Sequence, residues 1–136
     1  MKSFTRYLEF NTSKRIEIVH ITPEVEKIVK ESKIKEGFAL VSSLHVTSAV
    51  IVNENDPNLH SDFLAVLERL APFKASYKHN VSDDNAAAHI WRHLLGNQAL
   101  LPITNGKLEL GVWGQVFYCE FDGQRKKRVL VKVIGE

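Results

Sequence analysis

The last 40 residues constrain the fold most, because they hold four short apolar runs separated by turn signals. Strands are expected over residues 99–104, 107–112, 115–121 and 126–134. Asn105-Gly106 is a strong signal for a type I′ hairpin turn between the first two strands, and Asp122-Gly123 lies between the last two. Consecutive strands with such short connections predict an antiparallel meander.

Strand and helix signals alternate through the preceding residues. Two strands are expected at 4–10 and 15–21, and two more at 38–44 and 46–53. Between these pairs, Thr22 is an N-cap candidate with Pro23 at the first helical position. The apolar spacing that follows predicts a helix to about Lys35, ended by Gly37.

Two further helices are expected between residues 56 and 96. Asp56-Pro57 starts the first, which stops before Pro72. Ser82 is the expected N-cap of the second, which runs from about Asp83 to Leu95. The order of all these elements predicts an α+β fold over residues 1–136: a compact single domain of largely antiparallel sheets with about three helices.

Composition narrows the class of protein. Apolar residues make up 44% and charged residues 25%, the ordinary globular balance. Cys119 is the one cysteine, so an internal disulfide is excluded, and the residue is expected to pack in a strand. No apolar run is long enough to span a bilayer, and a cytoplasmic protein without a membrane partner is expected. A net charge of +2 is too small to indicate a nucleic-acid partner.

The expected strand at 126–134 is apolar on both faces, as Val129, Leu130, Val131 and Ile134 show. Three helices cannot cover every such surface, so a homo-oligomer is expected. The basic run Arg125–Arg128 beside this strand is either a solvated hairpin end or an anion site.

Polar clusters adjoin several expected elements. His45 opens the buried strand expected at 46–53, and a polar stretch, Asn53-Glu54-Asn55-Asp56, ends it. Tyr77-Lys78-His79 and the stretch Asp83–His89 come later. We expect His45, His79 and His89 to converge in one pocket.

The chemistry of such a pocket stays open at the level of residue types. Three histidines suit Zn²⁺, whereas Glu54, Asp56, Asp83 and Asp84 suit Mg²⁺ with phosphate oxygens. A buried structural role for His45 is an equal alternative, and Asp83 and Asp84 are favoured at a helix start whatever the function. His93 shares a helix face with His89 but is expected in solvent.

Taken together, these motifs resemble the YjbQ family, also called secondary thiamine-phosphate synthases. The resemblance covers essentially the whole chain, and the segments that carry it are His45–Val50, Asn53–Pro57, Tyr77–His79, Asp83–His89, Leu110–Trp113 and Glu120–Gly123. It implies an α+β homotrimer. The chain departs from the family pattern at Gly114, where glutamine is usual, and at Gln124, where proline is common.

The family name implies that a hydroxymethylpyrimidine diphosphate is joined to a thiazole phosphate with release of diphosphate. Under that hypothesis Glu54, Asp84 and His89 are the catalytic candidates. Asn53, Tyr77, Asn85, Trp113 and Arg125 are the substrate-binding candidates, and His45, His79 and His89 the metal-binding ones. Asp83 and Asp84 would hold Mg²⁺, Arg125 would bind phosphate, and Trp113 or Tyr77 would stack on the pyrimidine.

Two alternatives remain. In a metal-dependent hydrolase, the histidines would hold Zn²⁺ while Glu54 or Asp84 activates water. In a non-enzymatic oligomeric protein, the pocket would only bind a small anionic metabolite.

Overall fold

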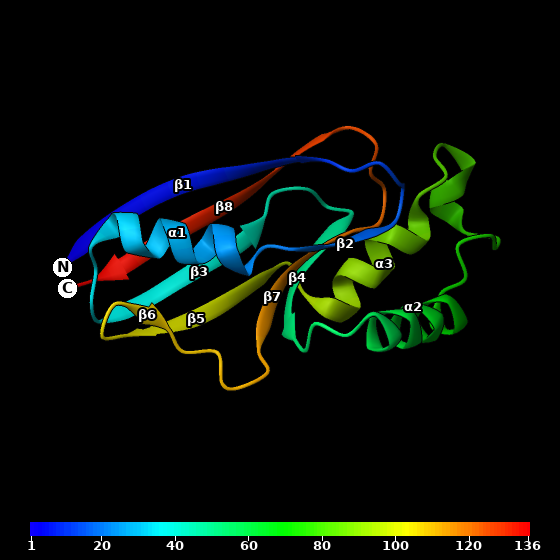
Figure 1. Ribbon diagram of the computed structural model, residues 1–136. Coiled ribbons are helices and arrows are strands. Elements are labelled where there is room, and N and C mark those ends of the chain that lie inside the picture. The colour runs from blue at the N-terminus through cyan, green and yellow to red at the C-terminus, as the bar shows by residue number, and fades with distance from the viewer.

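Two antiparallel sheets and three α-helices form the molecule in the computed structural model, which describes all 136 residues (Figure 1). The strands are β1 (Lys2–Asn11), β2 (Glu17–His20), β3 (Gly37–Ser43), β4 (Ser48–Asn53), β5 (Gln98–Thr104), β6 (Lys107–Leu108), β7 (Gln115–Glu120) and β8 (Lys126–Gly135). The helices are α1 (Thr22–Ser32), α2 (Pro57–Leu70) and α3 (Ala86–Leu95), with a 3₁₀ turn, η1, at Lys78–Val81. The predicted α+β class, with largely antiparallel sheets and three helices, is confirmed.

The larger sheet has the order β1-β8-β3-β5-β6, so the C-terminal strand lies between β1 and β3. The smaller sheet has the order β2-β7-β4. Asn105 and Gly106 have φ of +52° and +79°, the left-handed conformations that a type I′ turn requires, and the predicted hairpin between β5 and β6 forms there.

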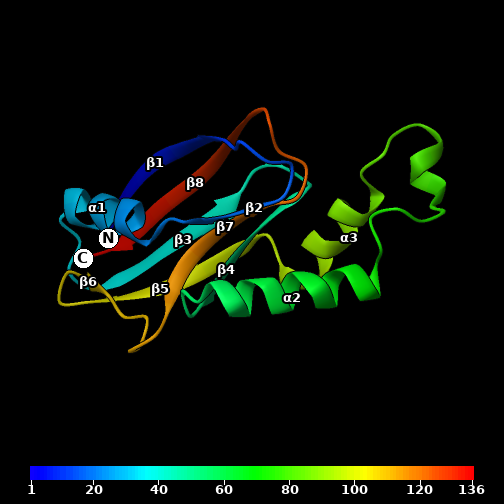
Figure 2. The ribbon, with the colours of Figure 1, turned by 45° about the vertical axis from the view of Figure 1, so that its right-hand side comes forward.

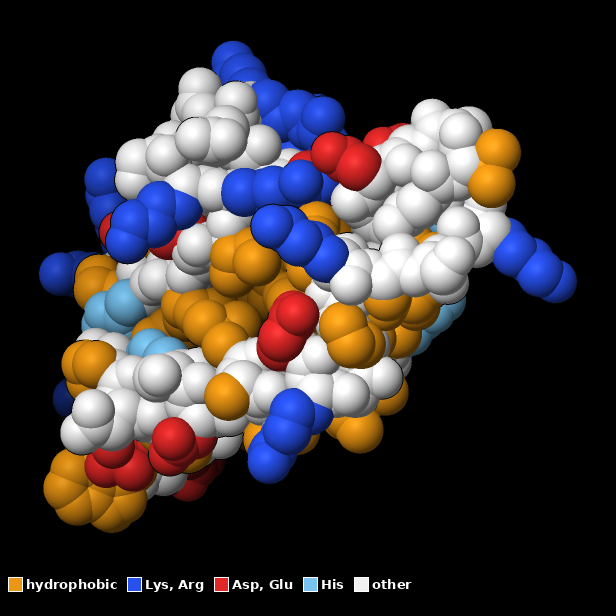
Figure 3. Space-filling model, turned by 90° about the vertical axis from the view of Figure 1, so that its right-hand side faces the viewer, with side chains coloured by type: hydrophobic (Ala, Val, Ile, Leu, Met, Phe, Trp, Pro, Cys, Tyr) orange, Lys and Arg blue, Asp and Glu red, His pale blue; other side chains and the backbone are white.

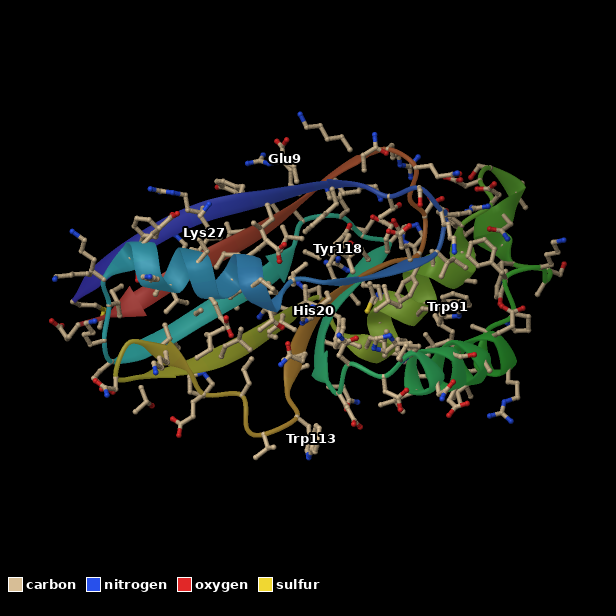
Figure 4. All side chains as sticks on the ribbon, viewed as in Figure 1. Glu9, His20, Lys27, Trp91, Trp113 and Tyr118 are labelled. Atoms are coloured by element: carbon tan, nitrogen blue, oxygen red, sulfur yellow. The ribbon has the colours of Figure 1, made fainter.

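The smaller sheet is buried on both faces. Alternate residues of β7 point to opposite sides: Val116 and Tyr118 join the core that α1 and the larger sheet enclose. Phe117 and Cys119 join a second core beneath α2 and α3, which lie side by side (Figure 2). Trp91 of α3 is only 2% exposed and points into this second core (Figure 4). The second core therefore fixes α3 against the sheet.

Several predicted boundaries were wrong. β4 begins at Ser48 rather than at residue 46, so His45 lies in the β3–β4 loop and not on the strand. The Arg92 guanidinium donates to the carbonyl oxygens of His45 and Ser48, and this contact holds the loop away from strand geometry.

The predicted start of the third helix was also wrong. α3 begins at Ala86 instead of Asp83, because the Asn80 side chain accepts the Ala86 N–H and Ser82 belongs to a separate turn. Thr22 does not cap α1; its Oγ1 accepts the Val116 N–H instead and ties the helix to β7.

The expected strand at 107–112 shortens to two residues, leaving a loop up to β7. No helix has both the length and the apolar composition needed to cross a bilayer.

Candidate functional site: a histidine pocket

His45, His79 and His89 line one pocket of about 490 Å³, as the sequence predicted. They reach it from three places: the β3–β4 loop, the 3₁₀ turn η1 and the middle of α3. The other lining residues are Val46, Thr47, Asp83, Asn85, Arg125 and Lys127. We call this the histidine pocket.

A chain of hydrogen bonds orients His79. The Asp122 carboxylate accepts from Asn85 Nδ2 at 3.0 Å, which turns the Asn85 carbonyl oxygen toward His79 Nε2 at 2.9 Å. An amide oxygen only accepts, so Nε2 carries the hydrogen. In the neutral ring Nδ1 is then left with its lone pair, and His79 is set up as a proton acceptor.

His89 lies directly against this imidazole. The two ring centroids are 4.8 Å apart and the planes meet at 79°. On the other side of the pair is a second depression of about 420 Å³, lined by Tyr77, Ala86 and Ile90 together with Lys78. The histidine pair therefore borders a polar pocket on one side and a more apolar, aromatic one on the other.

His45 is held differently. Its Nε2 accepts the backbone N–H of Arg128 at 3.0 Å, so a neutral ring carries its hydrogen on Nδ1. Burial, and then the positive charge of Lys127, lower the pKa of His45 below 6.5. His45 is consequently a neutral hydrogen-bonded side chain, with neither ring nitrogen free to bind a metal in this conformation.

The wall beside the pocket contains a compact charge network. Asp122 accepts from Arg15 Nε at 3.1 Å and from Arg125 at 2.8 Å. Arg15 also binds Asp84 at 2.9 Å and stacks on the Phe73 ring. Burial by itself raises the pKa of Asp122, but the Asn85 hydrogen bond and the neighbouring positive charges outweigh burial and lower that pKa. Asp122 is therefore a fixed anion that orients its partners.

Lys127 and Glu120 form a buried ion pair at the floor of the pocket. Their side chains are 4% and 0% exposed, with Nζ 3.1 Å from Oε2. The Tyr118 hydroxyl donates to the other oxygen of Glu120 at 2.5 Å. The sequence analysis named none of Glu120, Lys127 and Arg15 as site residues, although Glu120 begins a segment that carries the resemblance and Lys127 lies in the basic run. One signal for the ion pair was available in the sequence: Glu120 and Lys127 are opposite charges at the ends of two apolar runs, on either side of the Asp122-Gly123 turn. No sequence signal indicated Arg15.

Asp83 lines the pocket, Asp84 lines only the adjoining depression, and both residues precede α3 instead of opening it. Asp84 forms an ion pair with Arg15, whereas Asp83 forms no ion pair and only accepts the Asp84 N–H. A third depression of about 310 Å³ beside them, lined by Arg15, Arg125 and Gln124 among others, continues the polar surface.

Asn53, Glu54 and Trp113 do not reach the pocket within this chain. β4 runs from Ser48, near the pocket, to Asn53, so these residues lie at the far end of a six-residue strand, roughly 17 Å away. Trp113 precedes β7 at that same far end, because Gln115 pairs with Asn53. Figure 4 shows Trp113 pointing away from the molecule.

The three histidines do not form a metal-binding set. No group of three or more His, Cys, Asp or Glu side chains is arranged to hold a metal ion, and His45 has no free ring nitrogen. His79 Nδ1 is free, and Asp83 keeps a carboxylate oxygen without an ion-pair partner. The residues therefore do not fit a three-histidine zinc site.

Comparison with known proteins gives a consistent set of relatives. The family model for YjbQ-like UPF0047 proteins matches residues 6–136. A UPF0047 protein of Methanothermobacter thermautotrophicus is 40% identical over 100% of this chain and 95% of its own length. YugU of Bacillus subtilis is 34% identical over 94% of this chain and 97% of its own. A crystal structure from Sulfolobus solfataricus, described as a YbjQ-like protein of unknown function, superposes with a TM-score of 0.96 at 36% identity, over 99% of each chain.

Proposed function

The chain belongs to the UPF0047 family of YjbQ-like proteins, and from its histidine pocket we propose that it is an enzyme acting on a small phosphorylated heterocycle. Thiamine-phosphate formation is the reaction we assign to it. The observation that supports this is the position of the His79–His89 pair between a polar pocket and an aromatic one. A substrate with an anionic end and a flat ring matches that arrangement.

The polar side accounts for the anionic end. Arg125 is 61% exposed at its side chain and retains N–H groups that Asp122 does not use. The guanidinium can therefore bind a phosphate oxygen while it stays anchored to Asp122. Asp83 provides the free carboxylate for Mg²⁺, which spreads the charge of a departing diphosphate when it is bound there.

The opposite side accounts for the ring. Tyr77 donates its hydroxyl to the Pro72 carbonyl at 2.6 Å, which holds the phenol in place. Together with Ile90 it offers a flat apolar wall next to His89. Aromatic rings pack in offset or edge-to-face arrangements on such a wall.

In the assigned reaction the thiazole nitrogen forms a bond to the exocyclic carbon of the pyrimidine, and the C–O bond to diphosphate breaks. The diphosphate leaves with the bonding electron pair. His89 has no protein hydrogen-bond partner and lies next to the orientated His79, so it is suited to donate a proton to the departing oxygen. A residue in this role typically contributes about 10²-fold or more to the rate.

The zinc hydrolase receives less support. His45 Nε2 already accepts a backbone N–H, so only His79 and His89 have a ring nitrogen free to bind a metal. A purely binding role predicts ligand binding without turnover. Both alternatives are separated from the proposal by one assay.

The test is to supply purified protein with hydroxymethylpyrimidine diphosphate, thiazole phosphate and Mg²⁺, and to measure thiamine phosphate by chromatography. His89→Ala should lower turnover at least about 10²-fold. The matched control is His93→Ala, which removes an exposed histidine one turn further along the same helix and should leave turnover unchanged. Absence of product from the unaltered protein, or equal effects of both variants, would refute the assignment.

A further inference from the structure

The end of the smaller sheet farthest from the histidine pocket carries side chains that the single chain does not use. Trp113 is 71% exposed and Val112 is 89% exposed, and Val52 beside them is 39% exposed. Glu54 forms no ion pair and its carboxylate has no hydrogen bond, although its backbone N–H binds Asn53. We call these residues, Val52, Asn53, Glu54, Val112 and Trp113, the distal end. Tryptophan at this exposure is typical of a surface that another protein covers.

Apolar side chains are also exposed beside the histidine pocket. Val46, which lines it, is 62% exposed. Leu44, next to His45, is 45% exposed, and Val81, two residues after His79, is 90% exposed. Exposed apolar side chains gathered beside a pocket are typical of a surface that another molecule contacts.

The two surfaces also differ in charge. The pocket side carries Arg125, Lys126 and Arg128, at the start of β8. The distal end carries Glu54, which is in no ion pair, and Asp56, also in no ion pair, follows it two residues later. Figure 3 views the molecule from the right-hand side of Figure 1. Lys and Arg side chains gather along the top of this view, and acidic side chains lie beside hydrophobic ones at its lower left.

We propose that a second copy of this chain places its distal end over the histidine pocket, so that Glu54 and Trp113 of one subunit complete the site of the next. The contact joins two different surfaces, and such a heterologous contact forms a closed ring when its rotation allows.

The completed site gains what the single chain lacks. Within one chain the pocket has Asp83 as its one carboxylate without an ion-pair partner, and the one aromatic wall beside the histidine pair is Tyr77, in the neighbouring depression. The added indole supplies a second flat surface for a heterocycle, and the added carboxylate a second acidic group near the phosphate end. These roles rest on the proposed function; the contact between copies does not.

The contact is tested first without any substrate. Val46 and Val112 lie at opposite ends of β4 and β7, too far apart within one chain for a short bismaleimide to join. A Val46→Cys, Val112→Cys double variant should therefore give covalent multimers with that reagent on a denaturing gel. The control is Val46→Cys with Leu70→Cys, because Leu70 is 66% exposed at the end of α2 outside both surfaces. Cross-linking of the control to the same extent, or none in the test variant, would overturn the contact.

Association itself is measured by sedimentation. Trp113→Ala should shift the assembly to smaller species at micromolar concentration, whereas Leu70→Ala, which removes an equally exposed apolar side chain, should not. An unchanged mass for Trp113→Ala would contradict the proposal.

Complementation then tests the shared site. His89→Ala and Glu54→Gln subunits, each inactive alone, should regain a measurable fraction of turnover when they are co-expressed, because mixed rings contain some sites with both residues intact. Normal cross-linking with no recovery would overturn the shared site while keeping the contact. An inactive unaltered protein would refute the proposed function alone, and Glu54→Gln would then have to weaken binding of inorganic diphosphate with Mg²⁺ at least about tenfold for the shared site to stand.

Discussion

Replacing Lys127 by methionine tests whether the buried ion pair under the pocket holds the two cores together. Lys127 Nζ donates to Glu120 Oε2 at 3.1 Å and to the Asp122 carbonyl at 3.2 Å. Lys127→Met leaves the Glu120 carboxylate buried without a counter-ion. Removing one partner of such a pair costs about 3–5 kcal/mol of unfolding free energy.

The neighbouring residue provides the matched control. Lys126 pairs with Glu9 at 3.2 Å, but the two side chains are 70% and 52% exposed. Solvent screens that pair, so Lys126→Met should cost no more than about 1 kcal/mol.

Urea unfolding followed by circular dichroism measures both variants. With a slope of about 2 kcal/mol per molar urea, Lys127→Met should lower the midpoint by about 2 M and Lys126→Met by less than about 0.5 M. A loss below about 1 kcal/mol for Lys127→Met, or equal losses for both variants, would refute the reasoning.

Three further predictions concern single ionisable groups. The pKa of Asp122 is lowered, so its contribution to stability is complete above about pH 4 and disappears as the pH falls through the lowered pKa. The unfolding free energy of Asp122→Asn, measured in urea, should therefore vary less between pH 5 and 3 than that of the unaltered protein. The pKa of His45 is also lowered, so its imidazole NMR signals should titrate below pH 6.5, and its stabilising contribution should be present above that pH and lost as the pH falls; titration at or above 6.5 would contradict this. Burial raises the pKa of Cys119 to about 12, so a thiol reagent at pH 8 should modify it in urea but not in the folded protein.

The sequence predicted the histidine pocket because two of its histidines follow local patterns. Asn85 directly precedes α3 and lies four residues before His89, and the Tyr77–His79 cluster lies between α2, which ends before Pro72, and α3. These features depend on spacing along the chain. Local spacing was enough to identify them.

The position of His45 depended on distant residues instead. Val46 and Thr47 are β-branched and favour a strand, but Arg92, 47 residues away from His45, binds the loop carbonyls and prevents it. The prediction of the start of α3 failed for a similar reason, because the Asn80 side chain, and not Ser82, accepts a backbone N–H at the first turn of the helix. Tertiary contacts overrode local preference at both places.

The order of the larger sheet has a consequence for synthesis in the cell. β8 lies between β1 and β3, so the first strand made has no partner in that sheet until the last one exists. Lys2 pairs with Gly135 across almost the whole chain, and pairing over such a separation is slow to form. A nascent chain that ends before residue 126 leaves the edges of β1 and β3 that face β8 without hydrogen-bond partners. Such a chain depends on chaperones or on rapid completion to avoid aggregation.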